Sequence, residues 1–173
     1  MLQVITYGNP VLRKKAKSIP KVDAKIYQIL EEMVYTMRHN RVKGCGLAAP
    51  QVGLSLRLAV VEPTENHLFY LINPEIVSKK GSQHDTEGCL SIPGVYGSVE
   101  RSTEIHYISL DYKTGKKEMY RAKDFAARVI QHEIDHLNGV LFTDHVPPSE
   151  PLEFIKGEPI PKPLLEKYKV KNS

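Results

Sequence analysis

Apolar residues recur with a helical period in residues 23–39 of the chain. Four of them fall three or four positions apart, namely Ile26, Leu30, Met33 and Met37. This spacing places them on one face of an α-helix. Asp23 can cap the first turn, and Asn40 can end the helix. We therefore predict a helix over residues 23–39 and assign it a packing role only.

Short runs rich in β-branched and aromatic residues predict strands farther along the chain. The expected strands cover residues 57–62, 68–72, 75–79, 86–92, 104–111 and 117–121. The Asn-Pro pair at 73–74 signals a turn, so the first three strands are expected to form an antiparallel meander. The sequence Lys-Thr-Gly-Lys at 113–116 predicts a hairpin between the last two. The Pro-Gly pair at 93–94 and Gly97 are interpreted as interruptions after the strand at 86–92.

A second helix is predicted over residues 123–138, followed by Gly139 at the position where helices often end in a left-handed residue. Prolines then recur at 147, 148, 151, 159, 161 and 163, so little regular structure is expected before a short helix at 163–169. The pattern predicts an α+β fold, with antiparallel sheets packed around a buried helix in the C-terminal half. At 173 residues, the chain is expected to form one domain, 1–173, with a proline-rich tail from about residue 147.

The second predicted helix carries the sequence Gln-His-Glu-Ile-Asp-His at residues 131–136. His132 and His136 are four positions apart, so both imidazoles point to one place beside the helix. Glu133 lies near the same edge and is not needed as a ligand. Two histidines at this spacing with an adjacent glutamate are typical of a divalent-metal hydrolase, in which the glutamate acts on a metal-bound water.

Two histidines leave a tetrahedral metal site short of a third protein ligand. In metzincins a third histidine follows the helix, but Phe142 occupies that position here. In thermolysin-like enzymes a glutamate comes from a later helix, whereas the later glutamates here lie in the proline-rich tail. Cys89, between Gly88 and a short apolar run, is therefore our candidate for the third ligand.

Composition places the chain among ordinary globular proteins. Its two cysteines are too few for a disulfide framework, so a reducing compartment is the better expectation. The first residues show no basic segment followed by an apolar one, and no apolar run reaches about 18 residues, so we expect a cytoplasmic protein without membrane contact. A net charge of +4 is too mild for a specific nucleic-acid reader.

Three segments together resemble the signature motifs of the peptide deformylase family, in the family's order. They are Gly-Cys-Gly-Leu-Ala-Ala-Pro-Gln at 44–51, Glu-Gly-Cys-Leu-Ser at 87–91, and the histidine motif at 131–136. The resemblance extends from about Tyr7 to Phe142. It implies a small α+β hydrolase that removes the N-formyl group from formyl-methionyl nascent peptides during protein biosynthesis and releases formate. It also implies ferrous iron as the native metal, with zinc, nickel or cobalt as alternatives.

The residues themselves fit this chemistry. Ligation by Cys89, His132 and His136 would leave the fourth metal position for water, whose pKa a metal brings from about 15.7 towards ~7. Glu133 would take the proton and pass it to the leaving amine. The carbonyl oxygen becomes anionic as water adds, and the Gln51 amide and the Leu90 N–H would stabilise it.

Substrate contacts are expected from small residues and from the helix. Those of the first kind are Gly44, Cys45, Gly46 and Gly88, which leave room for an extended peptide to add as a strand. A site closed around a formyl hydrogen would exclude larger acyl groups. On the ligand face of the helix, Phe125 and Val129 are expected to line an apolar pocket for the methionine side chain. Arg128 shares that face, and only its alkyl stem would fit there.

Glu87 and Arg101 are expected to form an ion pair that holds the cysteine strand in place. The alternative is a pair of solvated charges at a sheet edge, which contribute little.

Three other interpretations of the metal motif remain open. Cys45 could join the proposed ligands in a closed, non-catalytic zinc site, although such sites usually have closely paired cysteines. The chain could be a general metallopeptidase, or a binding module stapled by a metal. His145 is a weak further ligand candidate.

The tail carries five lysines, Lys156, Lys162, Lys167, Lys169 and Lys171. They could contact the ribosome surface, where a nascent peptide emerges. The competing interpretation is a solvated tail.

Overall fold

The structure is a computed structural model that describes residues 1–168 of the chain. Its helices are α1 (Ala24–His39), α2 (Asp124–Leu137) and α3 (Lys162–Lys167), with 3-10 helices η1 (Pro10–Arg13), η2 (Ala49–Val52) and η3 (Phe142–His145). Its strands are β1 (Gly46–Ala48), β2 (Leu58–Val61), β3 (Phe69–Ile72), β4 (Glu75–Lys80), β5 (Gln83–Cys89), β6 (Ile92–Arg101), β7 (Glu104–Leu110), β8 (Lys117–Lys123) and β9 (Glu153–Phe154).

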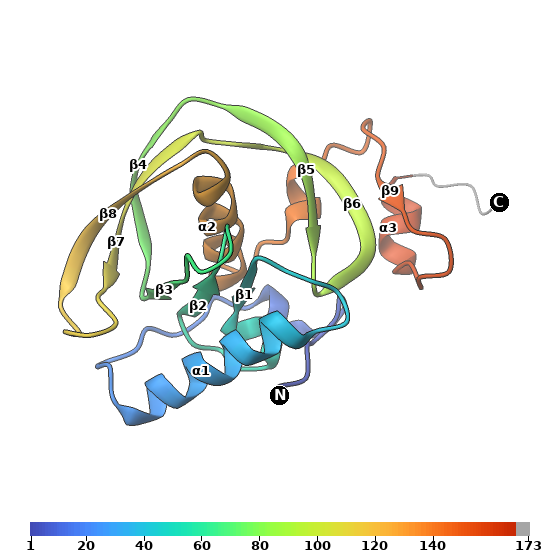
Figure 1. The fold of residues 1–173 in the computed structure, drawn as a ribbon. Helices are drawn as coiled ribbons and strands as arrows, with labels where there is room; N and C mark the ends of the chain where they lie inside the picture. Colours follow the sequence, from blue (N-terminus) through green and yellow to red (C-terminus); the bar gives the residue numbers. More distant parts are fainter. Residues whose placement is uncertain (169–173) are drawn as a thin grey trace.

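In residues 1–168 these strands form three antiparallel sheets, with orders β1-β2-β3, β4-β7-β8 and β5-β6-β9. Helix α2 lies between them, with β4, β7 and β8 on one side and β5 and β6 on the other (Figure 1). The predicted α+β class, with antiparallel sheets around a C-terminal-half helix, is confirmed. None of the helices in these residues is long and apolar enough to span a bilayer.

The sheet β1-β2-β3 separates the two long helices. In β2 all four residues are buried, and successive side chains point to opposite faces. Leu58 and Val60 belong to the cluster that contains the apolar face of α1, whereas Ala59 and Val61 belong to the cluster of α2. The short apolar strand is thus covered on both faces, and it fixes α2 relative to the rest of the chain.

Both long helices lie where the sequence predicts them, α1 over 24–39 and α2 over 124–137. The Asp23 side chain accepts a hydrogen bond from the Ile26 N–H, as an N-cap does. After α2, Gly139 adopts a φ of +75°, and its N–H donates to the carbonyl of His136. The segment carrying the metal motif is therefore a helix with a defined end.

The predicted meander is wrong in one connection. β2 and β3 are paired, but β4 leaves that sheet and pairs with β7. The turn at Asn73 explains the departure, because this residue adopts a φ of +50°. The predicted hairpin of β7 and β8 is confirmed, with Leu110 opposite Lys117.

The strand predicted at 86–92 is also corrected. β5 ends at Cys89, the chain turns at Leu90 and Ser91, and the ten-residue strand β6 follows. The sequence signals at 93–97 were misinterpreted as interruptions. Gly97 lies inside β6. A glycine is needed there because Leu152 packs on this position: a Cβ would lie 2.7 Å from Leu152 Cδ2.

The tail is packed on the protein, so the expectation of a solvated tail is wrong for its described part. Its strand β9 pairs with β6, and Leu152, Leu164 and Tyr168 are buried in the cluster that contains Phe142. Helix α3 confirms the predicted short helix in position. Lys169, its predicted last residue, and Lys171 lie outside the described residues.

Candidate metal and catalytic centre

Three potential metal ligands converge at the start of the β5–β6 turn and on one face of α2. The ligand atoms of Cys89, His132 and His136 all lie within 4.8 Å of one another. Cys89 Sγ is 3.3 Å from His136 Nε2, and the two imidazole centroids are 5.0 Å apart. Both histidines project from successive turns of α2, as their spacing of four residues predicts.

The donor set fits a divalent metal of borderline softness. One thiolate and two imidazoles suit zinc, iron, cobalt or nickel. Burial lowers the pKa of His136, which favours the neutral imidazole that a metal needs. Burial acts in the same direction on His132, but hydrogen bonds with Cys89 and Glu87 outweigh it and raise the pKa of that imidazole.

Cys45 is not part of this ligand group, which within residues 1–168 consists of the three residues above. It lines the adjacent pocket instead and packs against the core cluster of α2. His145 is not part of the group either. The alternative of a closed four-ligand site is therefore not supported by the geometry.

Glu87 contacts the imidazole of His132 through its Nδ1 atom. Its Oε1 lies 2.7 Å from His132 Nδ1, which places the proton of a neutral imidazole on Nδ1 and leaves the Nε2 lone pair for a ligand role. Burial alone would raise the pKa of Glu87, but hydrogen bonds from His132 and Arg101 hold that pKa well below its usual range.

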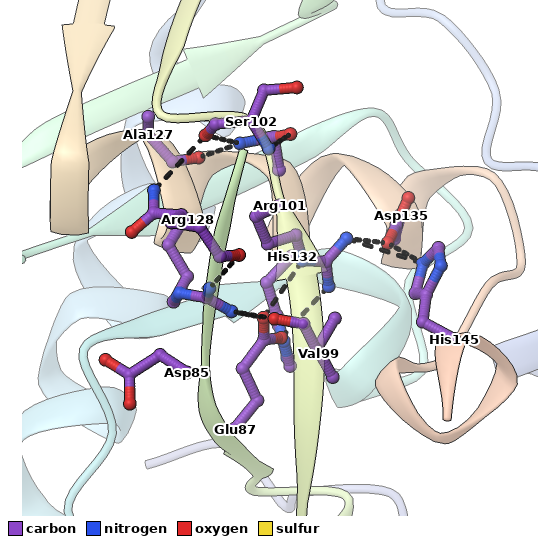
Figure 2. Close-up of polar contacts among 12 residues, drawn as sticks. Asp85, Glu87, Val99, Arg101, Ser102, Ala127, Arg128, His132, Asp135 and His145 are labelled. Atoms are coloured by element: carbon purple, nitrogen blue, oxygen red, sulfur yellow. Dashed lines mark hydrogen bonds and ion pairs between the residues drawn. The ribbon is translucent and has the colours of Figure 1, made fainter. Parts of the chain in front are cut away.

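Two arginines surround the Glu87 carboxylate (Figure 2). Arg101 Nε donates to Oε2 at 2.9 Å and its Nη2 to Oε1 at 3.0 Å. Both side chains are almost fully buried, so the predicted ion pair is present and is not a solvated surface pair. Arg128 Nη1 also donates to Glu87 Oε2, at 2.6 Å.

The expectation for Arg128 is corrected by this arrangement. The residue lines the pocket, but its guanidinium is buried and does not extend to solvent past an apolar stem. It also donates to the backbone carbonyls of Val99 and Gln83. Arg128 therefore ties α2 to β5 and β6 through three partners.

A second acidic residue extends the network away from the pocket (Figure 2). Arg101 Nη1 donates to Asp135 Oδ2 at 2.5 Å, and His145 Nε2 lies 2.8 Å from the same oxygen. Sequence reasoning missed Asp135, although its position between the two motif histidines gave a possible signal. It considered His145 only as a weak further ligand candidate, whereas His145 contacts Asp135 instead.

Glu133 faces the ligand group from the same helix. The side chain is buried, and its Oε2 has no hydrogen-bond partner within the described residues. Burial is the main cause that raises the pKa of Glu133 to about 7; the charge of His132 opposes this shift, and the charge of Glu87 supports it. A carboxyl group of this kind can both accept and return a proton near neutral pH.

The Glu133 carboxylate leaves no room for a side chain at position 46, so a glycine is needed there. A Cβ at position 46 would overlap Glu133 Oε1. At Gly44 and Gly88 an added Cβ would meet Leu90 Cδ1 at 2.9 Å and the Tyr96 ring at 2.5 Å. Within the chain, the glycines thus make room for side chains that shape the pocket.

The orientation of the Gln51 amide follows from its hydrogen bonds. Its Oε1 accepts from the Ala48 N–H at 2.8 Å. Its Nε2 therefore faces the site, 3.4 Å from Cys89 Sγ and 3.2 Å from Ser91 Oγ. The amide N–H groups point toward the centre and not into the η2 turn.

A pocket opens beside these groups, and most of the predicted site residues line it. They are Gly44, Cys45, Gly46, Gln51, Gly88, Cys89, Leu90, Phe125, Val129, His132 and Glu133. Val129 is buried, whereas Phe125 is 47% exposed. The buried His136 lies behind the pocket and is not among its lining residues.

This site agrees with the comparisons. Residues 1–151 match the family model of polypeptide deformylase. A peptide deformylase of Symbiobacterium thermophilum is 49% identical over 146 residues, which are 83% of this chain and 66%, just under two thirds, of that relative. One from Caldanaerobacter subterraneus is 50% identical over 139 residues, 80% of this chain and 85% of the relative.

Solved structures agree as well. The Thermotoga maritima peptide deformylase superposes with a TM-score of 0.80 at 41% identity, covering 84% of this chain and 97% of that one. Fold and site define a metal-binding hydrolase of the α+β type. The chain belongs to the polypeptide deformylase family, and it is an enzyme that deformylates peptides.

Proposed function

We propose that this protein removes the N-formyl group from formyl-methionyl nascent peptides and releases formate. The observation that carries the proposal is the convergence of Cys89, His132 and His136 to within 4.8 Å beside the buried carboxylate of Glu133. A ligand set of this size and an adjacent unpaired base are the two parts that amide hydrolysis by water requires.

Cys89, His132 and His136 would hold one divalent metal. When bound, the metal supplies Lewis acidity, which makes water easier to deprotonate near neutral pH and polarises the formyl carbonyl. Ferrous iron is the native metal in this proposal, and zinc, nickel or cobalt would substitute for it, because a sulfur and two nitrogens suit all four.

Glu133 acts as the general base and then as the general acid. It takes a proton from the attacking water and delivers it to the leaving amine, so that the amide bond can break. The unpartnered Oε2 atom supports this role, because a base must keep one oxygen free of other donors. Its pKa of about 7 fits a group that must do both.

Gln51 and the Leu90 N–H stabilise the oxygen that becomes negative as water adds to the formyl carbon. The support for Gln51 is the fixed amide, whose Oε1 is held by the Ala48 N–H so that the donor group faces Cys89. Leu90 directly follows the ligand cysteine. One such donor contributes about 10²–10³ to the rate.

The pocket accommodates the first residue of the peptide. Phe125 and Val129 form an apolar wall for the methionine side chain, whose burial contributes roughly 1.5–3 kcal/mol. The segment with Gly44, Cys45 and Gly46 and the strand at Gly88 flank the extended peptide, whose backbone adds as a strand. Selection for formyl arises because larger acyl groups do not fit between these walls.

In this proposal the protein acts in the cytoplasm and at the ribosome, where formyl-methionyl nascent peptides emerge. Lys156, Lys162 and Lys167 are exposed and would contact ribosomal phosphates. Replacement of Lys156 and Lys162 by glutamate should lower co-sedimentation with ribosomes, most clearly at low salt. Unchanged binding would remove this part of the proposal.

The central experiment measures formate release by anaerobically purified protein loaded with defined metals. A formyl-methionyl tripeptide should be hydrolysed, whereas the acetyl-methionyl tripeptide and an internal peptide bond should not. Equal cleavage of an unformylated peptide would instead indicate a general metallopeptidase. Absence of formate with every metal would refute the proposed function.

A further inference from the structure

The tail contributes a segment that touches both sides of the pocket mouth. This segment, residues 153–158, is called the strap below. It follows the part of the chain that matches the family model, which ends at residue 151. The strap begins as β9 at the edge of β6 (Figure 1).

On one side the strap is bonded to the wall formed by residues 93–96. Phe154 pairs with Val95 and Glu153 with Tyr96, and Pro93, Gly94 and Tyr96 line the pocket. The Ile155 N–H donates to the Gly94 carbonyl at 2.8 Å. A Cβ at Gly94 would lie 2.6 Å from Glu158 Cβ, so Glu158 packs directly on this wall.

On the other side the strap pairs with the wall formed by residues 41–46. Arg41 Nη1 lies 2.9 Å from Glu158 Oε1, and Arg41 Nη2 lies 3.0 Å from Oε2. Arg41 directly precedes Val42 and Lys43, which line the pocket. Glu158 therefore contacts both walls, one through its Cβ and the other through its carboxylate.

We propose that the strap is a positioning element, and that Glu158 and Arg41 set the separation of the two walls between which the peptide binds. The inference rests on the proposed function for its substrate. Neither residue touches the ligand group, so the pair acts on binding through the walls. A fixed separation would lower the cost of ordering the walls when the peptide binds.

The test reverses the charge of each partner separately and then of both. Arg41→Glu and Glu158→Arg each place like charges together, whereas the double variant restores an ion pair. Exposed pairs contribute little individually, so each single variant should raise KM for a formyl-methionyl tripeptide only modestly, by roughly two- to fivefold. The double variant should return KM to the wild-type value. kcat should stay unchanged throughout, because uniform binding alone is altered.

Arg121→Glu provides the matched control. Arg121 forms a comparably exposed pair with Glu104, on β7 and β8 and outside the pocket lining. It should leave KM and kcat unchanged. Removal of the whole tail is less suitable, because Leu152 and Leu164 belong to the cluster around Phe142 and their loss would test stability.

Hydrogen exchange gives a second readout that needs no activity. The amides of residues 41–46, 94–96 and 155 should exchange faster in each single variant and return to the wild-type rate in the double variant. Unchanged exchange in both single variants would overturn the strap as a positioning element. Faster exchange without a change in KM would overturn its role in peptide binding. Failure of the wild-type protein to release formate would refute the proposed function. The exchange rates would still test whether Arg41 and Glu158 fix the two walls of the pocket.

Discussion

Glu87 and His132 are joined by a contact of 2.7 Å between Oε1 and Nδ1, in a position where both side chains are nearly buried. Arg101 and Arg128 hold the same carboxylate. The Glu87 carboxylate thus holds the His132 imidazole, and the guanidinium groups of Arg101 and Arg128 hold that carboxylate in turn. This arrangement orients one of the three proposed metal donors before any metal binds.

Glu87→Gln should therefore weaken metal binding. The amide can still contact His132, but it cannot balance two buried guanidinium groups, so the orientation of the imidazole is no longer fixed. We expect metal affinity to fall about 10- to 100-fold and the free energy of unfolding to fall by about 3–5 kcal/mol. Competition with a chelator measures the first effect, and urea unfolding the second.

Glu100→Gln is the control for this change, because Glu100 is an exposed acid on the neighbouring strand β6. It should change neither quantity. Metal affinity in Glu87→Gln equal to that of the wild type would contradict the positioning role of Glu87.

Glu133→Gln should separate metal binding from chemistry. The amide has nearly the same volume and keeps the packing against Gly46, but it cannot accept a proton. Metal content should remain at one ion per chain, while kcat for formate release should fall about 10²–10⁴-fold. Elemental analysis and the formate assay are run on the same preparation. A fully active variant would show that another group carries the proton.

Tyr107 should make stability fall at alkaline pH. Burial raises the pKa of Tyr107 to about 12, with a smaller contribution from Tyr120, whereas an unfolded tyrosine titrates near 10. Below pH 10 the phenol is protonated in both states and its contribution is complete. Between about 10 and 12 the unfolded state releases its proton first, so the free energy of unfolding falls as pH rises.

Tyr107→Phe should reduce that fall by up to about 2–3 kcal/mol between pH 9 and 12, as followed by urea unfolding at each pH. Tyr35→Phe, at an exposed position, should leave the pH dependence unchanged. An identical alkaline fall in Tyr107→Phe would show that other groups cause it.

Local spacing made the helices and the candidate ligands predictable. The apolar period of α1 and the separation of His132 from His136 are properties of a few consecutive residues, and they need no knowledge of the rest of the fold. Cys89 could be found because the other candidates failed on position. Its proximity to the imidazoles depends on how the turn after β5 meets α2, which the structure adds.

Features that depend on distant partners were not predictable. Gly97 resembles an interruption until Leu152, far along the chain, is seen to pack on it. The guanidinium of Arg128 is accepted in the interior only because Glu87 and two carbonyls of neighbouring strands receive it. The contact between Asp135 and His145 depends on the turn that follows α2. In each case a long-range contact overrides the local pattern.

Gly46→Ala should reduce activity more than Gly44→Ala, although both add a single methyl group to the same segment. At position 46 the new Cβ would overlap the Glu133 carboxylate, which is buried and has little room to move, so the base would be displaced. At position 44 the nearest atoms are Cδ1, Cγ and Cδ2 of the Leu90 side chain, which can shift by rotation about side-chain bonds. Since a displacement of about 1 Å can lower a rate about 10²-fold, we expect a loss of that size in kcat for Gly46→Ala. We expect a loss of less than about tenfold for Gly44→Ala, because only the wall moves. Metal content should be unchanged in both variants, and equal kcat values would mean that the Gly46 backbone does not constrain Glu133.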